Sequence, residues 1–205
     1  MMYVVVDLEM CQVPKLYRKG QYRYSMETIQ IGAVLLDECF NVVDSFMTHV
    51  KPEFGLITTK IQQLTRITRK DIANAPKMKE SLKMFADWIP EGATIVAWSG
   101  SDQAQILHER ECKEINFEGI NKLDGEWLDC QETFSSIIRN PRRYNLVEAM
   151  NLSDIDYDDN VHDGLVDAKN TALLFRKMMT EKEYRFNKYY QAIMDEAFEY
   201  EQIGA

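Results

Sequence analysis

Apolar positions in the first quarter of the chain form three runs that predict β-strands. Residues 3–6 are a continuous β-branched and aromatic stretch, the pattern of a central strand covered on both faces. Residues 28–36 and 42–50 are also strand-like, and a segment of turn length separates them. These three strands are expected to form an antiparallel meander.

A helical pattern starts after Pro76, which is expected at the first helical position. Its apolar residues recur at helical spacing until Pro90: Met78, Leu82, Phe85 and Ile89. Residues 93–98 then predict a strand, Ser101 an N-cap, and residues 102–113 a second helix. This alternation of strand and helix indicates an α/β domain.

The alternation continues through the second half of the chain. A strand is predicted around Trp127, followed by helices over 131–139, Asn145–Met150 and Gly164–Met179. We therefore expect one domain over residues 1–180. Residues 181–205 are expected to be a C-terminal amphipathic helix that packs on this domain or on a partner, for example a second copy in a homodimer. Its apolar stripe is Phe186, Tyr190, Ile193, Ala197 and Tyr200.

The charge of the chain excludes a protein that simply coats nucleic acid. Its net charge is −9 and its pI is about 4.9, whereas coating proteins depend on Lys and Arg to neutralise phosphates. An enzyme that acts on nucleic acid remains compatible with this charge. The cysteines are scattered without a CxxC pair, and the apolar N-terminal run is too short for a signal peptide or a membrane span. A reducing cytoplasm is the expected location, with no membrane association.

Two acidic residues follow the first apolar run. Asp7 and Glu9 lie two positions apart at the expected end of the first strand, so their side chains point to the same face. Two adjacent carboxylates repel each other unless cations neutralise them, and oxygen ligands suit Mg²⁺ or Mn²⁺. Taken alone, the pair is weak evidence, and a solvated strand end is the more frequent origin of such a triplet.

Three further residues extend this candidate site. Asp102 follows a predicted strand and opens a helix, which suits either a functional group or an acid that interacts with the helix dipole. His162 and Asp167 flank the start of the last predicted helix. A histidine beside carboxylates can act as a general base, although a surface loop histidine would have the same local sequence.

The order of these residues along the chain is more specific than any one of them. Residues 5–9 (Val-Val-Asp-Leu-Glu), 29–34 (Ile-Gln-Ile-Gly-Ala-Val), 64–68 (Leu-Thr-Arg-Ile-Thr) and 162–172 (His-Asp-Gly-Leu-Val-Asp-Ala-Lys-Asn-Thr-Ala) resemble the DEDDh (DnaQ-like) group of 3′-to-5′ exonucleases. The resemblance spans roughly residues 2–179. Within the group, the chain is most similar to the stand-alone enhanced-RNAi-type and bacterial sporulation-inhibitor-type exonucleases.

The resemblance implies an RNase H-like mixed sheet flanked by helices and a site for two Mg²⁺ or Mn²⁺ ions. In this implied site Asp7, Glu9 and Asp167 surround one ion. Asp7 also contacts the second ion, Asp102 holds it directly or through water, and His162 is the base. Met10 and Leu64 would contact the terminal nucleotide, although Met10 departs from the Thr, Ala or Cys often found at its position.

The implied activity is 3′-to-5′ hydrolysis of single-stranded nucleic acid to nucleoside 5′-monophosphates. RNA is the favoured substrate, because of the similarity to the stand-alone branch. The alternatives are a DNA 3′-end trimming or proofreading exonuclease, a catalytically silent RNA-binding module and a two-metal phosphomonoesterase. Residues 15–24 mix basic and tyrosine side chains, which suits either nucleic-acid binding or a solvated loop.

Overall fold

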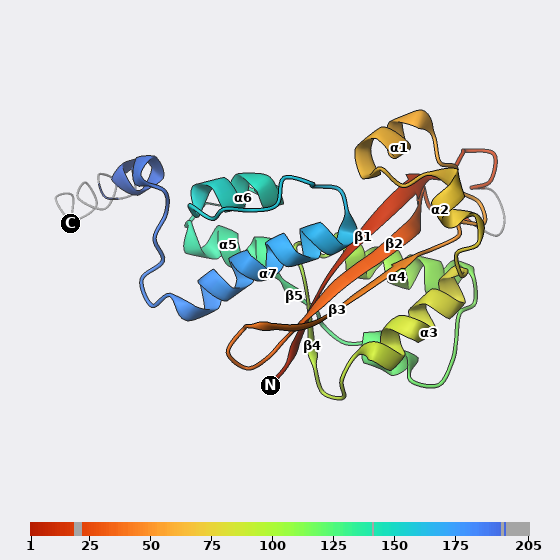
Figure 1. Cartoon of the computed structure of the whole chain (residues 1–205), viewed down its shortest axis with the longest axis horizontal. Coiled ribbons are helices and arrows are strands. Elements are labelled where there is room, and N and C mark those ends of the chain that lie inside the picture. The colour runs from red at the N-terminus through yellow and green to blue at the C-terminus, as the bar shows by residue number, and fades with distance from the viewer. Residues whose placement is uncertain (19–21, 141, 194, 196–205) are drawn as a thin grey trace.

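A five-stranded mixed sheet forms the centre of the protein. The computed structural model describes residues 1–18, 22–140, 142–193 and 195. The strands follow the order β3-β2-β1-β4-β5 across the sheet (Figure 1). Their bounds are β1 Tyr3–Gln12, β2 Met26–Leu36, β3 Val42–His49, β4 Thr94–Ala97 and β5 Leu128–Asp129. β1, β2 and β3 pair antiparallel, whereas β1–β4 and β4–β5 pair parallel, which confirms the meander and the mixed sheet.

Helices cover both faces of this sheet. Their bounds are α1 Thr59–Thr65, α2 Arg69–Ala73, α3 Met78–Trp88, α4 Ser101–Cys112, α5 Cys130–Ile137, α6 Leu146–Leu152 and α7 Gly164–Thr180, with a 3₁₀ turn at Ile120–Leu123. The sequence pattern did not predict α1 and α2, because each is too short to show a helical repeat. Both helices instead begin at threonine N-caps, Thr58 and Thr68.

Strand alternation divides the apolar core into two layers. Val4, Val6 and Leu8 of β1 point to the side of α3, α4 and the 3₁₀ turn. Val5 points to the opposite side, where it packs with side chains of α5, α6 and α7. Figure 1 shows α7 lying across the sheet with α5 and α6 beside it. Asp7 and Glu9 have the same parity as Val5, so they face the α7 side.

The structure corrects several predicted element ends. β1 continues to Gln12, so Asp7 and Glu9 lie inside the strand, because β2 pairs with β1 well beyond the apolar run. Gly100, rather than Ser101, is the N-cap of α4. Pro76 precedes α3, whose N-cap is Lys77, and Asn145 caps α6 from outside through a hydrogen bond to the Glu148 N–H.

A buried polar network joins β2, α4 and the segment that leads to α1. The Glu27 carboxylate accepts hydrogen bonds from the backbone N–H groups of residues 53–55. It also pairs with Lys113 at 2.7 Å, and Lys113 pairs with Glu109 at 2.6 Å. Both carboxylates are fully buried. Burial lowers the pKa of Lys113, but Glu109 and Glu27 together have the larger effect, so the pKa of Lys113 is raised overall. The network holds the chain in position before α1.

The segment after α7 returns to the domain. Tyr184, Phe186 and Tyr190 pack against the core layer of α5–α7. Within the described chain the C-terminal helical turn spans residues 188–193, so Phe186 precedes it, and Ile193 is 61% exposed. Ala197 and Tyr200 of the predicted stripe lie outside the described residues. In the part of the chain that the structure describes, no helix combines the length and apolar character needed to cross a membrane.

Candidate active site

The first two acidic residues project from β1 toward the start of α7. Asp7 lies opposite Gly32 of β2, and Glu9 lies opposite Gln30. Residues directly opposite each other in an antiparallel pair share a face, so all four point toward α7. Glu9 is 7% exposed and Asp7 is half-buried. The strand period thus places both carboxylates under the helix that carries Asp167.

The start of α7 lies unusually close to the sheet. A Cβ atom on Gly32 would lie 2.2 Å from Gly164 C and from Leu165 N, so only glycine allows the observed approach. His162 has a left-handed backbone with φ of 65°, which turns the chain into the helix. Its N–H donates to Asp167 Oδ2 at 2.8 Å. Asp167 and His162 therefore form one local unit at the helix start.

Asp102 reaches the same region from the opposite side of the sheet. Pairing between β1 and β4 stops at Val6 and Ala97. The next free N–H of β1 on that edge belongs to Leu8, and it donates to Asp102 Oδ1 at 3.2 Å. Asp102 is 5% exposed and lies in the first turn of α4. Because β4 ends at Ala97, the Leu8 N–H of β1 stays free to bind Asp102 and holds its carboxylate beside β1.

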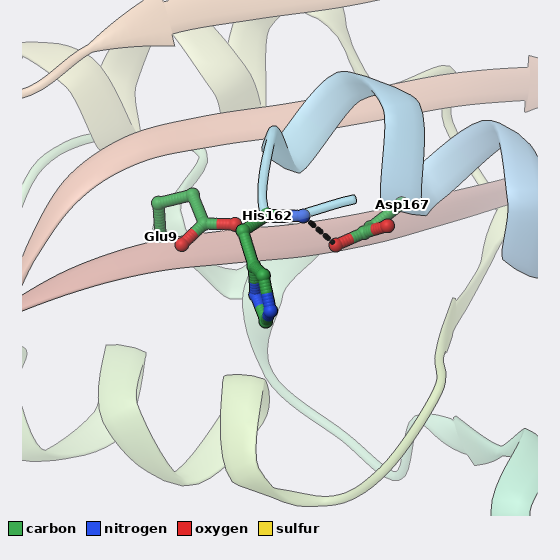
Figure 2. A group of neighbouring side chains, drawn as sticks. All are labelled: Glu9, His162 and Asp167. Atoms are coloured by element: carbon green, nitrogen blue, oxygen red, sulfur yellow. Dashed lines mark hydrogen bonds between the residues drawn. The ribbon is translucent and has the colours of Figure 1, made fainter. Parts of the chain in front are cut away.

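Side chains from three elements converge in this region. Glu9, His162 and Asp167 each offer one potential ligand atom, and these atoms lie within 4.8 Å of one another. In Figure 2 the His162 backbone lies between the Glu9 and Asp167 carboxylates, and its ring projects to one side of them. Asp167 Oδ1 is buried and has no hydrogen-bond partner among the described residues. A buried oxygen of this kind fits a metal ligand, because an uncompensated polar atom is otherwise costly.

The pKa values of the acidic side chains in this group are raised by burial and, for Asp7 and Glu9, by the neighbouring carboxylates. Burial, followed by the charges of Asp167, Asp163 and Asp102, raises the pKa of Glu9 to about 8. Burial raises the pKa of Asp102 to about 7, against hydrogen bonds that lower it. Burial and the neighbouring carboxylates raise the pKa of Asp7 well above its ordinary value. Such mutual repulsion between largely buried carboxylates favours binding of divalent cations, which would offset the negative charge.

The residues expected to contact substrate lie at the margins of this group. Met10 follows Glu9 and packs, half-buried, against the core layer of α3 and α4. Leu64 is on α1 and is 42% exposed. Two residues further on, the Arg66 guanidinium donates to the Asn160 carbonyl at 3.3 Å, which places the end of α1 beside the loop that leads to His162.

The interpretation of residues 15–24 as a base-stacking and phosphate-binding segment is wrong at Tyr22. Tyr22 is fully buried, and its hydroxyl donates to the Met26 carbonyl at 2.6 Å, so it cannot stack on a base. Arg23 forms an ion pair with Glu111. Tertiary contacts use these side chains, and the local sequence does not show those contacts.

Sequence reasoning missed two residues beside the carboxylates. Asp163 caps α7, and its charge raises the pKa of both Asp7 and Glu9. Its position next to His162, before an apolar helix, was an available N-cap signal. Gln30 is 2% exposed, and its side-chain oxygen accepts a hydrogen bond from the Gly164 N–H at 2.7 Å. No local sequence pattern predicts that contact, because residues 30 and 164 come together only in the folded protein.

Comparison with known proteins agrees with this geometry. The nuclease domain of 3′hExo, described as a DEDDh family member and solved bound to rAMP, superposes with a TM-score of 0.75 at 21% identity, covering 91% of this chain and 96% of that one. Cell-death related nuclease 4 superposes with a TM-score of 0.71 at 18% identity, covering 91% and 66% of the two chains. These likenesses confirm the RNase H-like exonuclease fold.

Sequence relatives point in the same direction. ERI1 exoribonuclease 2 of Danio rerio is 28% identical over 202 residues, covering 87% of this chain and 35% of that protein. Human 3′-5′ exoribonuclease 1 is 27% identical over 177 residues, covering 79% and 49%. The chain thus spans between about a third and a half of the length of these relatives. The RNase T family model, described as "Exonuclease", matches residues 4–175. The chain therefore belongs to the exonuclease family, and its resemblance to the DEDDh group is confirmed.

Proposed function

We propose that the protein is a 3′-to-5′ exonuclease that hydrolyses single-stranded nucleic acid, with RNA favoured over DNA, to nucleoside 5′-monophosphates. The observation that carries the proposal is the convergence of buried carboxylates and one histidine from β1, α4 and the start of α7. A solvated strand end or a surface histidine would not gather such residues from segments this far apart in the chain. Membership of the exonuclease family supports a role for these converging residues in phosphodiester hydrolysis.

The donor set suits hard divalent cations. Asp7, Glu9 and Asp167 would hold one Mg²⁺ or Mn²⁺ ion. Asp7 and Asp102 would hold a second ion. Carboxylate oxygens are the preferred ligands of both metals, and the buried Asp167 Oδ1 offers a free acceptor. Two bound ions supply Lewis-acid stabilisation of the attacking and leaving oxygens of a phosphodiester.

The protein side chains then have separate roles. The four carboxylates would hold the metal ions rather than transfer protons. His162 accepts the proton of the attacking water, and its exposed position lets it pass that proton to solvent. The left-handed backbone at His162 and its N–H bond to Asp167 hold the residue beside Glu9 and Asp167. A general base of this kind contributes roughly 10²- to 10⁴-fold in rate.

The preference for a 3′ end would arise beside the carboxylates. Met10 and Leu64 would contact the terminal nucleotide, one next to Glu9 and the other on the exposed side of α1. The preference for RNA is supported by relatives named exoribonucleases. The net charge of −9 leaves little basic surface for a long duplex, so affinity would depend on the last few nucleotides.

The test is a time course on 5′-labelled single strands of RNA and DNA that end in a 3′-hydroxyl or a 3′-phosphate. We expect a descending ladder from the 3′-hydroxyl RNA, slower digestion of DNA, and block by the 3′-phosphate, whose charge would meet the carboxylates. Asp7→Asn and Asp102→Asn, which stay folded, should each fall below about one percent of wild-type turnover, because each loses a metal ligand. Cleavage of circular strands would refute an exonuclease that starts from the 3′ end.

Two further expectations concern the cellular setting. The scattered cysteines support a reducing compartment such as the cytoplasm. The contacts of Phe186 and Tyr190 with the core favour a C-terminal segment that packs on its own domain. The exposed side chain of Ile193 is consistent with a contact between two copies of the chain. Sedimentation of wild type and Ile193→Asp would decide between a monomer and a homodimer.

A further inference from the structure

A single buried side chain of the sheet holds the first residue of α7. Gln30 lies on β2 directly opposite Glu9, on the face that α7 covers. Its Oε1 accepts the Gly164 N–H at 2.7 Å, across 134 positions of sequence. The side chain is 2% exposed, so water does not replace this contact. Gln30 therefore links the strand pair that carries Asp7 and Glu9 to the helix that carries Asp167.

This bond differs in kind from the other contacts at the helix start. The first N–H groups of a helix have no partner within the helix and need external acceptors. Asp163 accepts the N–H groups of Leu165 and Val166, but Asp163 belongs to the same segment and cannot position the helix on the sheet. A residue of the sheet can fix that relation, and Gln30 contributes to it through the Gly164 N–H.

Glycines make the contact possible by bringing the two backbones together. Gly32 lies two residues after Gln30, and a Cβ there would overlap the backbone of Gly164 and Leu165. A Cβ on Gly164 would lie 3.1 Å from both the Asp7 carbonyl oxygen and Gln30 Oε1. The helix start thus rests against β1 and β2 with almost no spare space, and small changes in its position will reach the carboxylates.

We propose that Gln30 is a positioning residue: by holding the Gly164 N–H, it sets the place of His162 and Asp167 relative to Asp7 and Glu9. The proposal rests on the proposed function, because it assigns Gln30 a part in building the metal site. Gln30 itself does not touch the reacting atoms. Residues that orient metal ligands typically change metal affinity or activity by 10- to 100-fold when removed, about the size of effect expected here.

The experiment compares two substitutions at Gln30 with a matched control. Gln30→Met keeps the length of the side chain but removes the acceptor, whereas Gln30→Glu retains an acceptor oxygen. Gln105→Met is the control, since Gln105 is another buried glutamine (6% exposed) that bonds to Met26 and Glu109 rather than to α7. Each variant is measured by the Gly164 amide resonance and its hydrogen exchange in metal-free protein, by Mn²⁺ binding, and by kcat and KM.

We expect Gln30→Met to shift the Gly164 amide proton upfield and to speed its exchange. Mn²⁺ binding should weaken about tenfold and kcat should fall roughly 10- to 100-fold, with KM changed by less than about threefold. Gln30→Glu should restore the amide signature and most of kcat, and Gln105→Met should leave the Gly164 amide and kcat near wild type. If the methionine variant does not fold, Gln30→Asn, which withdraws the acceptor by one methylene, provides the same test.

Two results would overturn the proposal. One is a Gln30→Met protein that has lost the Gly164 amide signature but keeps wild-type Mn²⁺ affinity and wild-type kcat. The other is an equal loss in Gln105→Met, which would show a general effect of removing a buried amide. The Gly164 amide and Mn²⁺ measurements do not depend on turnover. They therefore test the role of Gln30 even if the wild-type protein degrades no 3′ end.

Discussion

The close approach of α7 to β2 predicts that Gly32→Ala will impair catalysis more than it impairs folding. The added carbon would lie 2.2 Å from Gly164 C and from Leu165 N, both backbone atoms. Non-bonded carbon contacts are favourable at about 3.5 to 4.0 Å, so the helix start must retreat by more than roughly 1 Å. Asp167 and His162 move with it, whereas Asp7 and Glu9 stay on β1.

The magnitude follows from these distances. Inserting one carbon into a packed interior costs about 1–3 kcal/mol, which a domain of this size tolerates. A displacement of about 1 Å at a catalytic group costs on the order of 10²-fold in rate. The expected variant therefore remains folded at 25 °C, loses roughly 10²-fold in kcat and binds Mn²⁺ more weakly.

The assay measures kcat on a 5′-labelled single-stranded RNA together with the melting temperature in the presence and absence of Mn²⁺. Gly100→Ala is the matched control, because Gly100 has a φ of −66° and the nearest atom to its added carbon, Asp129 Oδ2, is 3.8 Å away. It lies two residues before Asp102 and should change neither quantity. Gly32→Ala with wild-type kcat and wild-type metal stabilisation would refute the reasoning that backbone contact at Gly32 places the metal ligands.

Three other predictions concern charge and stability. His162→Ala should keep the Mn²⁺-induced rise in melting temperature but lose roughly 10²- to 10⁴-fold in kcat, and loss of metal binding instead would make His162 a ligand. Because the pKa of Glu9 is raised from 4.5 to about 8, the folded metal-free protein holds more protons than the unfolded chain within that window. Its free energy of unfolding should thus fall as pH rises from 4.5 to 8, by on the order of a few kcal/mol, and Mg²⁺ should reverse the fall; a flat profile in calorimetry would contradict the raised pKa. Glu27→Ala should lower the free energy of unfolding in urea by about 3–5 kcal/mol, because Lys113 and the N–H groups of residues 53–55 lose their buried acceptor. The control Glu118→Ala, at an exposed position, should lower it by almost nothing. Equal urea midpoints for the two variants would argue against the buried network.

Local periodicity determined the parts of the site that depend on one element at a time. Asp7 and Glu9 share a face because side chains of a strand alternate, whatever the rest of the chain does. Asp167 lies in the first turn of a helix whose start is marked by Gly164, close to His162. The order of the strands and of the longer helices was equally visible, since apolar spacing differs between the two structures, whereas the short helices α1 and α2 were not.

The distances between those elements depended on contacts far apart in sequence. The extension of β1 beyond Glu9 required pairing with β2, and the position of Asp102 required β4 to end at Ala97 and leave the Leu8 N–H free. The raised pKa of Glu9 required burial beside Asp167 and Asp163.

The most consequential feature that the sequence did not reveal is the position of the start of α7 on the sheet. It depends on one glutamine oxygen and on the absence of a side chain at Gly32. Neither property has a period or a local spacing, because each is defined by a partner 132 or more positions away. Residue identities and strand and helix periods therefore determined which chemical groups face the site, whereas only tertiary packing decided how closely those groups meet.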